Sequence, residues 1–258
     1  MSNFFNRKKS SPTTSRPFKD FYNEWHATLS ITLLPQLRHA LSSFSISPTL
    51  LSSHVDATHH HFQSYYTALD AAASSDVAST LFPSWRNSLE SPFLWLGDLH
   101  PYLFTNLLRS FLDQDDQDPT PRAAAQEFLE RPWHVEVAWR SPSKALTMKV
   151  DQIECGLRLM VPALAARARH AQKKLVESVG ADWRRKEGVK AAVEAEMEEL
   201  VGVVVDANRL RRSVLADVLS VTSVYQAAMF LEAFAQFLVG FRDEKLVKEF
   251  EKCQLVIN

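Results

Sequence analysis

An aspartate and a histidine, Asp98 and His100, lie two residues apart in the stretch SPFLWLGDLHPYLF. A carboxylate beside an imidazole could transfer protons in general acid–base catalysis. Two nearby positions on one chain do not by themselves build such a pair, and neither G-x-S-x-G nor H-E-x-x-H occurs in the sequence. Pro101 favours the first turn of a helix, where Asp98 or His100 would lie near the cap. We therefore predict a helix start rather than a catalytic pair.

Four histidines, His54, His59, His60 and His61, form a cluster in a predicted helix over residues 50–73. A metal site on a helix would use histidines four residues apart on one face. His54 and His61 share a face, whereas His59 to His61 fan around the helix, and only Asp56 adds another ligand type. We favour a solvated helix face, and weak metal binding stays open as the alternative.

Cys155 follows Glu154 and could be considered as a nucleophile. Its apolar neighbours, Ile153 and Leu157, favour a different interpretation. A cysteine on an apolar helix commonly packs as a small hydrophobic residue, and we predict that role here.

Basic side chains gather in the second half of the chain and are followed by acidic ones at Glu194, Glu196, Glu198 and Glu199. Such a polarised pair of helices could bind an acidic partner or an anionic membrane surface. A solvated face with pairs four residues apart is the favoured interpretation. The candidate interaction face comprises Arg167, Arg169, Lys173, Lys174, Arg184, Arg185 and Lys186.

The sequence carries no enzyme signature. Phosphate-loop, dinucleotide and kinase motifs are absent, as expected for a chain with six glycines. The net charge of −1 provides no overall field to attract nucleic acid. Two cysteines, Cys155 and Cys253, make no disulfide framework and favour a reducing compartment. The N-terminus lacks the apolar region of a signal peptide, and no run of about 18 apolar residues predicts a membrane span. An interaction or regulatory protein without cofactor or metal is expected.

The elements that must position these residues are predicted to be helical throughout. Hydrophobic residues make up 46% of the 258 positions, enough for a substantial core, and glycine is scarce. We predict an all-α bundle of about eight helices with long C-terminal helices. It would form one domain over residues 17–254, after a disordered tail at 1–16.

Several boundaries are predicted from pattern and from helix-breaking residues. Pro35 should kink or end the first helix. Residues 113–122 read as an acidic linker, and a short helix is expected over 123–130. Val135, Val137 and Trp139 alternate with other residues in the only segment whose pattern resembles a β-strand. The remaining predicted helices cover residues 101–112, 146–207 with a break at Gly180 or Gly188, 208–219, 223–240, and about 242–253.

Three motifs, in order along the chain, resemble the plant Delay-of-Germination domain family. They are an aromatic–x–x–Trp helix, a Trp–x–x–x–x–Glu element followed by aliphatic–Trp–aliphatic–Gly, and an ending close to A-D-x-L-R…Q-A-A-x-F-L. Asn208 stands where the family usually has aspartate. The family-motif residues are Tyr22, Trp25, Trp85, Glu90, Trp95, Gly97, Asp98, Asn208, Leu210 and Gln226.

Details of the stretches WLGDLHPYLFTNLLRSFL and SPSKALTMKVDQIECGLRLMVPALAARARHAQ look closest to the pollen-aperture branch of this family. That resemblance implies a plant protein that marks plasma-membrane domains of developing pollen where exine is not laid down. It would act through other proteins at the plasma membrane, from the cytoplasm and membrane periphery, with peripheral membrane association through the basic face. Its oligomeric state stays open.

The alternative within the family is a nuclear transcription co-regulator of the dormancy or TGA type. The stretch before Phe18 is too short for a basic region and zipper, so direct nucleic-acid binding is not expected. Some dormancy-type members bind haem through histidines near the C-terminal helix. Phe237 and Phe241 occupy the corresponding places here, so no cofactor is expected.

Overall fold

The computed structural model describes residues 17–43, 47–113, 133–140, 142–182 and 186–253, and within them the predicted all-α class is confirmed. The predicted tail at 1–16, the helix at 123–130 and nearly all of the acidic linker lie outside these residues. The first half contains α1 (Phe18–Thr28), η1 (Leu29–Leu33), α2 (Leu34–Ser42), α3 (Pro48–Ser75), α4 (Val77–Leu81) and η2 (Ser91–Phe93). A two-stranded hairpin of β1 (Leu94–Trp95) and β2 (Asp98–Leu99) leads into α5 (Tyr102–Leu112). The second half contains α7 (Trp133–Glu136), α8 (Lys144–Asp182), α9 (Lys186–Val221), α10 (Val224–Gly240) and α11 (Glu244–Lys252).

Pro35 does not end the first helix. The chain passes from α1 through the π-helical turn η1 into α2, with Pro35 in the first turn of α2. Proline has no N–H and clashes with the carbonyl four residues earlier in an α-helix. A wider π-helical turn just before Pro35 relieves this conflict, so α1 and α2 continue one another.

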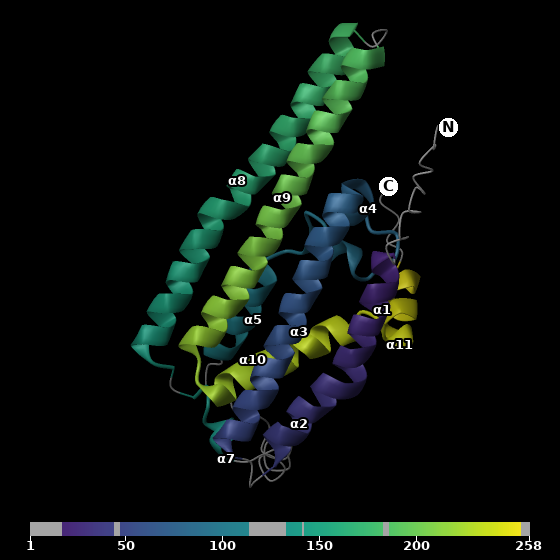
Figure 1. Ribbon diagram of the computed structural model, residues 1–258. Coiled ribbons are helices and arrows are strands. Elements are labelled where there is room, and N and C mark those ends of the chain that lie inside the picture. The colour runs from purple at the N-terminus through teal and green to yellow at the C-terminus, as the bar shows by residue number, and fades with distance from the viewer. Residues whose placement is uncertain (1–16, 44–46, 114–132, 141, 183–185, 254–258) are drawn as a thin grey trace, which may run out of the picture.

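The long helical segment after residue 143 forms two antiparallel helices, α8 and α9. They lie side by side and project from the rest of the molecule (Figure 1). The break falls between Asp182 and Lys186, within the interval bounded by Gly180 and Gly188. The predicted boundary at 207/208 is wrong, because α9 continues to Val221. Asn208 and Arg211 are buried in the interior of this helix, where they bond to other elements. These two polar residues therefore do not mark the end of a helix.

The strand predicted around Val135 is also wrong. Trp133–Glu136 forms the short helix α7, and turns follow it. Val135 and Trp139 are buried, at 3% and 5% exposure, while Val137 is 40% exposed. Burial therefore repeats every four residues, as on a helical turn, and the apparent alternation is coincidental.

The strands instead lie in the stretch containing Asp98. Leu94 pairs with Leu99 and Trp95 with Asp98 in an antiparallel hairpin closed by Leu96 and Gly97. Both turn residues have positive φ, +46° for Leu96 and +88° for Gly97. This is the arrangement of a tight two-residue hairpin turn, in which glycine is favoured. The glycine of the aliphatic–Trp–aliphatic–Gly motif therefore lies in a tight turn.

Gly97→Ala is expected to lower the free energy of unfolding by about 1–3 kcal/mol. The added Cβ would lie 3.0 Å from the carbonyl oxygen of Thr80 and would hold alanine at a strained φ of +88°. Gly156→Ala is the matched control, because a Cβ there meets nothing within 4 Å in the helix α8. We expect Gly156→Ala to be neutral or stabilising. Urea unfolding of the two variants checks this, and equal effects would contradict it.

The core is organised around α10, which contacts α2, α3, α5 and α7 (Figure 1). Ser223 and Gln226 form a capping box at its N-terminus, and its buried residues include Phe230, Leu231 and Phe234. No single described helix is long and apolar enough to cross a membrane. α10 and α11 reach that length and composition only together, as a pair bent by 60°.

Candidate functional site

A buried ion network lies beneath the β-hairpin, and Arg86 is at its centre. Arg86 sits in the turn after α4 with 2% of its side chain exposed. Its guanidinium pairs with Glu90, and its Nη2 donates to Asp98 Oδ1 at 2.6 Å. Both carboxylate side chains are 3% exposed. Charges buried this deeply persist in proteins when they are paired and hydrogen-bonded.

Tyrosines from α1 and α3 complete the network. Tyr22 donates to Glu90 Oε1 at 3.2 Å, and Tyr65 donates to Asp98 Oδ1 at 2.9 Å. Burial raises the pKa of Tyr22 to about 12 and that of Tyr65 well above its usual value, so both phenols stay protonated donors. Burial disfavours the charged form of Arg86, but Tyr65 and Asp98 outweigh it and hold the pKa of Arg86 above its usual value. The network thus ties α1 and α3 to the hairpin.

Arg211, in the middle of α9, holds the hairpin from the other side. It is fully buried, and its Nε donates to the carbonyl oxygen of Leu99 at 2.7 Å. Its Nη2 donates to the carbonyl oxygens of Trp95 and, at 3.2 Å, of Asp98. Nη1 donates to Asn208 Oδ1 at 2.7 Å. One guanidinium therefore satisfies backbone acceptors on both strands, and a point-like ammonium could not match this fork of donors.

Asn208 and Arg212 join α9 to α3 through Asp70. Asn208 Nδ2 donates to Asp70 Oδ1 at 2.7 Å, and Arg212 Nη2 to Asp70 Oδ2 at 2.9 Å. Asn208 bonds Arg211 with its oxygen and Asp70 with its nitrogen. An aspartate at position 208 could not donate to Asp70, so the amide suits this position.

The charges of this network are paired, and little space is left beside them. The hollow beside Arg86 and Asp98 has a volume of about 10 Å³, room for about one water. We predicted that Asp98 or His100 would lie near a helix cap. Asp98 does not: it lies buried in β2 and faces Arg86. His100 does lie at the start of α5, where its Nδ1 accepts from the N–H of Tyr102 at 3.2 Å. Asp98 and His100 thus have separate partners, and no catalytic pair forms.

Other family-motif residues pack around this network. Trp25 Nε1 donates to the carbonyl oxygen of His61 at 2.9 Å, and the two rings stack 4.9 Å apart. Trp85 lies half-buried against Phe18. Leu210 packs against the main core. Gln226 Nε2 donates to the carbonyl oxygen of Ala138 at 2.9 Å.

The sequence reasoning missed Arg86 and Tyr65. The four-residue spacing from Arg86 to Glu90, inside an aromatic-rich stretch, was the available signal. No sequence pattern links Arg86 to Tyr65, because these residues belong to separate elements.

The histidine cluster is not one solvated face. His61 Nε2 donates to the carbonyl oxygen of Trp25 at 2.9 Å, and His59 Nε2 accepts from Gln63 at 2.8 Å. Burial lowers the pKa of both His59 and His61. His60 is exposed. In the described part of the chain, no group of three or more His, Cys, Asp or Glu side chains is placed to hold a metal ion.

The prediction for Cys155 is wrong, because this side chain is exposed on the outer side of α8. The helix does have an apolar inner side, with Ile153 and Leu157 buried. Cys155 lies two residues from each of them, which on a helix places it on a different face.

The candidate interaction face is only partly described. Arg167 pairs with Glu199 at 3.0 Å and Asp206 at 2.6 Å, so its charge joins α8 to α9. Lys173 pairs with Glu177 four residues on, at 3.6 Å, as the solvated-face interpretation predicts. Arg169 and Lys174 are exposed on α8. Arg184 and Arg185, and the side chain of Lys186, lie outside the described residues. Binding by this face stays a prediction.

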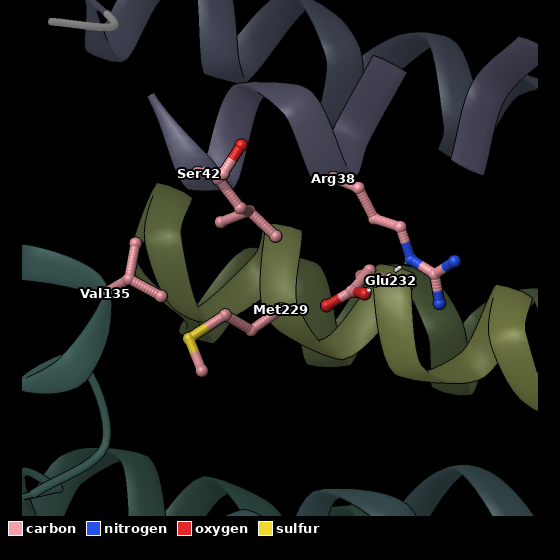
Figure 2. Close-up of a pocket in the computed structure, with 6 residues that line it drawn as sticks. Arg38, Ser42, Val135, Met229 and Glu232 are labelled. Carbon is pink, nitrogen blue, oxygen red and sulfur yellow. Dashed lines mark hydrogen bonds and ion pairs between the residues drawn. The ribbon is translucent and has the colours of Figure 1, made fainter. Parts of the chain in front are cut away.

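A separate pocket of about 360 Å³ opens between α2, α7 and α10 (Figure 2). Its polar wall is the ion pair between Arg38 and Glu232, 2.9 Å apart, and Arg38 also donates to Gln236. Ser42, Val135 and Met229 line the opposite part. Arg38 and Glu232 neutralise one another at this wall, and the Ser42 hydroxyl donates to the carbonyl oxygen of His39 at 3.0 Å.

His26 on α1 provides a test of the α1–α10 packing through pH. It is 7% exposed and lies close to the backbone of Leu238 in α10, and its Nε2 is buried without a hydrogen-bond partner among the described residues. Burial, with the nearby Arg242 adding to it, lowers the pKa of His26 from 6.5 to about 4. The unfolded chain therefore takes up a proton first, and the stability that neutral His26 contributes above pH 6.5 is lost as pH falls toward 4.

We expect the wild type to lose about 1–2 kcal/mol more than His26→Gln between pH 7.5 and 5. Urea unfolding at the two pH values measures this difference. His60→Gln, at an exposed position on the neighbouring α3, is the matched control. A parallel loss in wild type and His26→Gln would contradict the assignment.

Comparison with known proteins decides the family. The DOG1 family model, described as seed dormancy control, matches residues 33–110. Protein INAPERTURATE POLLEN1 of Arabidopsis thaliana is 46% identical over 268 aligned residues, covering 96% of each chain. The chain belongs to the Inaperturate Pollen family. A rice member, from Oryza sativa subsp. japonica, is 37% identical over 95% of this chain and 93% of its own length.

This chain also shows weaker similarity to transcription factors. Transcription factor TGA7 of Arabidopsis thaliana is 24% identical over 87% of this chain, which covers 54% of TGA7. The match to the DOG1 model and the similarity to the two Inaperturate Pollen proteins confirm the family recognition made from the three motifs.

Proposed function

We propose that this protein is a non-enzymatic developmental factor that specifies pollen aperture sites, plasma-membrane domains protected from exine deposition. The observation that carries the proposal is 46% identity to INAPERTURATE POLLEN1 across 96% of both chains. The buried network supports a non-catalytic role, because its charges are paired and the hollow beside it holds only about one water. The protein would act by binding other proteins at the plasma membrane.

Disruption of the gene for this protein tests the role directly. We expect pollen with continuous exine and no apertures, and restoration of apertures when the full chain is reintroduced. Normal apertures in the disrupted plants would overturn the proposal. The TGA-like alternative, a nuclear co-regulator, would instead predict nuclear accumulation and association with a bZIP partner.

The basic face provides a second testable element of this proposal. Reversing the charges of Arg184, Arg185 and Lys186 to glutamate is expected to reduce the plasma-membrane signal of a fluorescent fusion several-fold, because each basic residue near an anionic surface adds about 1 kcal/mol. Reversal of Lys245, Lys248 and Lys252 on α11 is the matched control. An unchanged signal in the first variant would contradict membrane attraction by this face.

A further inference from the structure

A groove runs beside the tip of the β-hairpin, between α4, α8 and α9. It has a volume of about 470 Å³, and its walls are largely apolar. Phe82, at the end of α4, is 80% exposed there. The hairpin contributes Leu94, Trp95 and Leu96, and α9 contributes Met197. An exposed aromatic ring within an apolar hollow is typical of a surface that another molecule covers.

Glu196, which lines this groove, has one carboxylate oxygen without a partner among the described residues. Glu196 on α9 is 8% exposed, and its Oε2 is buried without a hydrogen-bond partner among the described residues. Glu196 is also the one charged side chain among the described residues that line the groove. A buried acceptor of this kind is unfavourable until a donor reaches it. Gln172 on α8 also lines the groove, but its exposed side-chain amide does not bond Glu196 Oε2. The missing partner of Glu196 Oε2 is therefore a positively charged or N–H-bearing group.

The hairpin tip that forms one wall is held in a strained conformation. Leu96 has a φ of +46°, where a side chain other than glycine is disfavoured. Arg211 fixes the carbonyl oxygens of Trp95 and Leu99 on either side of this turn. Strained residues that the surroundings hold in place are concentrated at binding and switch sites. Here the hairpin, held by Arg211, keeps Leu96 in its strained conformation at the wall of the groove.

We propose that this groove docks a peptide segment of another protein, in which a lysine or arginine is flanked by large apolar side chains. The cation would pair with Glu196, and the apolar side chains would contact Phe82, Leu96 and Met197. An open hollow of this kind suits a segment on a protein surface, since small-molecule sites enclose most of their ligand. This inference deepens the interaction role proposed above, because it names the chemistry of the partner.

Internal pairing is the main competing explanation for Glu196. This residue also lines the hollow between α8 and α9, where Lys174 and His170 lie. Glu196 Oε2, however, has no hydrogen-bond partner among the described residues, which include both of these side chains. If Glu196 served only to pair with Lys174, Glu196→Gln and Lys174→Ala would lower thermal stability alike and leave peptide binding unchanged.

The test begins with a random 16-residue phage-displayed peptide library, selected on the purified full-length chain. We expect enrichment of peptides with lysine or arginine next to at least two large apolar residues. A fluorescein-labelled synthetic copy of the most enriched peptide is then titrated against variants by fluorescence polarisation. Glu196→Gln and Phe82→Ser should each weaken binding at least tenfold. Glu194→Gln, exposed on the same helix, and Leu159→Ser, exposed on α8, should stay within twofold of wild type.

Three results would overturn the proposal: no enrichment, enriched peptides without a cation, or binding that survives both Glu196→Gln and Phe82→Ser. Analytical ultracentrifugation of the wild type tests whether a second copy of this chain occupies the groove. A dimer that Phe82→Ser dissociates would assign the groove to a second copy of this chain and also overturn the proposal. These outcomes concern the groove alone, and the gene disruption above tests the aperture role independently.

Discussion

Arg211→Met is expected to lower the free energy of unfolding by about 3–5 kcal/mol. Methionine fills most of the volume but donates nothing. The carbonyl oxygens of Trp95, Asp98 and Leu99 would lose their Arg211 bonds, as would Asn208 Oδ1. Each buried acceptor left without a partner costs about 1–3 kcal/mol. Urea unfolding followed by circular dichroism measures the loss.

Arg212→Met is the matched control for this prediction. Arg212 is the next residue in α9, but 27% of its side chain is exposed and it makes one ion pair, with Asp70 at 2.9 Å. Its replacement should cost about 1 kcal/mol or less. Arg211→Lys should fall between wild type and Arg211→Met, since an ammonium can reach only some of the acceptors. Equal effects of Arg211→Met and Arg212→Met would refute the supporting role of Arg211.

Arg86→Met is the second change with a large expected effect, again about 3–5 kcal/mol. It leaves Glu90 and Asp98 buried beside one another without a compensating cation. Tyr22 and Tyr65 would still donate to these carboxylates, but two neutral hydroxyls do not balance two negative charges. The destabilisation therefore comes mainly from the stranded carboxylates rather than from lost packing.

The triple variant Arg86→Met, Glu90→Gln, Asp98→Asn separates these two causes. Neutral amides keep the shape of the carboxylates and remove their charge. We expect the triple variant to recover at least half of the stability that Arg86→Met loses, a strongly non-additive result. Additive losses across the three changes would mean that the charges are not coupled as the structure places them.

Composition and scarce glycine were enough to predict the helical class, and Gly180 and Gly188 bounded the break between α8 and α9. These features depend on residues close together in the chain. The burial of Asp98 could not be predicted in this way. Its cation, Arg86, lies 12 residues away, and Tyr65 is 33 residues away. A carboxylate followed by Leu-His-Pro resembles a helix cap in the sequence, and only the folded chain shows that Asp98 faces a buried guanidinium.

The errors at Cys155, Val135 and Asn208 have a common physical cause. In each case tertiary packing decided between two local patterns of similar strength. Asn208 and Arg211 are polar residues in the interior of α9, and polar residues in a sequence suggest the end of a helix. The hydrogen bonds of Arg211 are made instead to the hairpin, where Leu99 lies 112 residues earlier in the chain. Family-motif residues such as Trp95 and Asn208 could be identified from the sequence, but their shared role in supporting the hairpin required the structure.

The most direct test of the proposed role is the location of a full-length fluorescent fusion in developing microspores at the tetrad stage. The account predicts discrete lines or spots at the plasma membrane, at the positions where apertures later form. Signal confined to the nucleus would contradict it and would favour the transcriptional co-regulator.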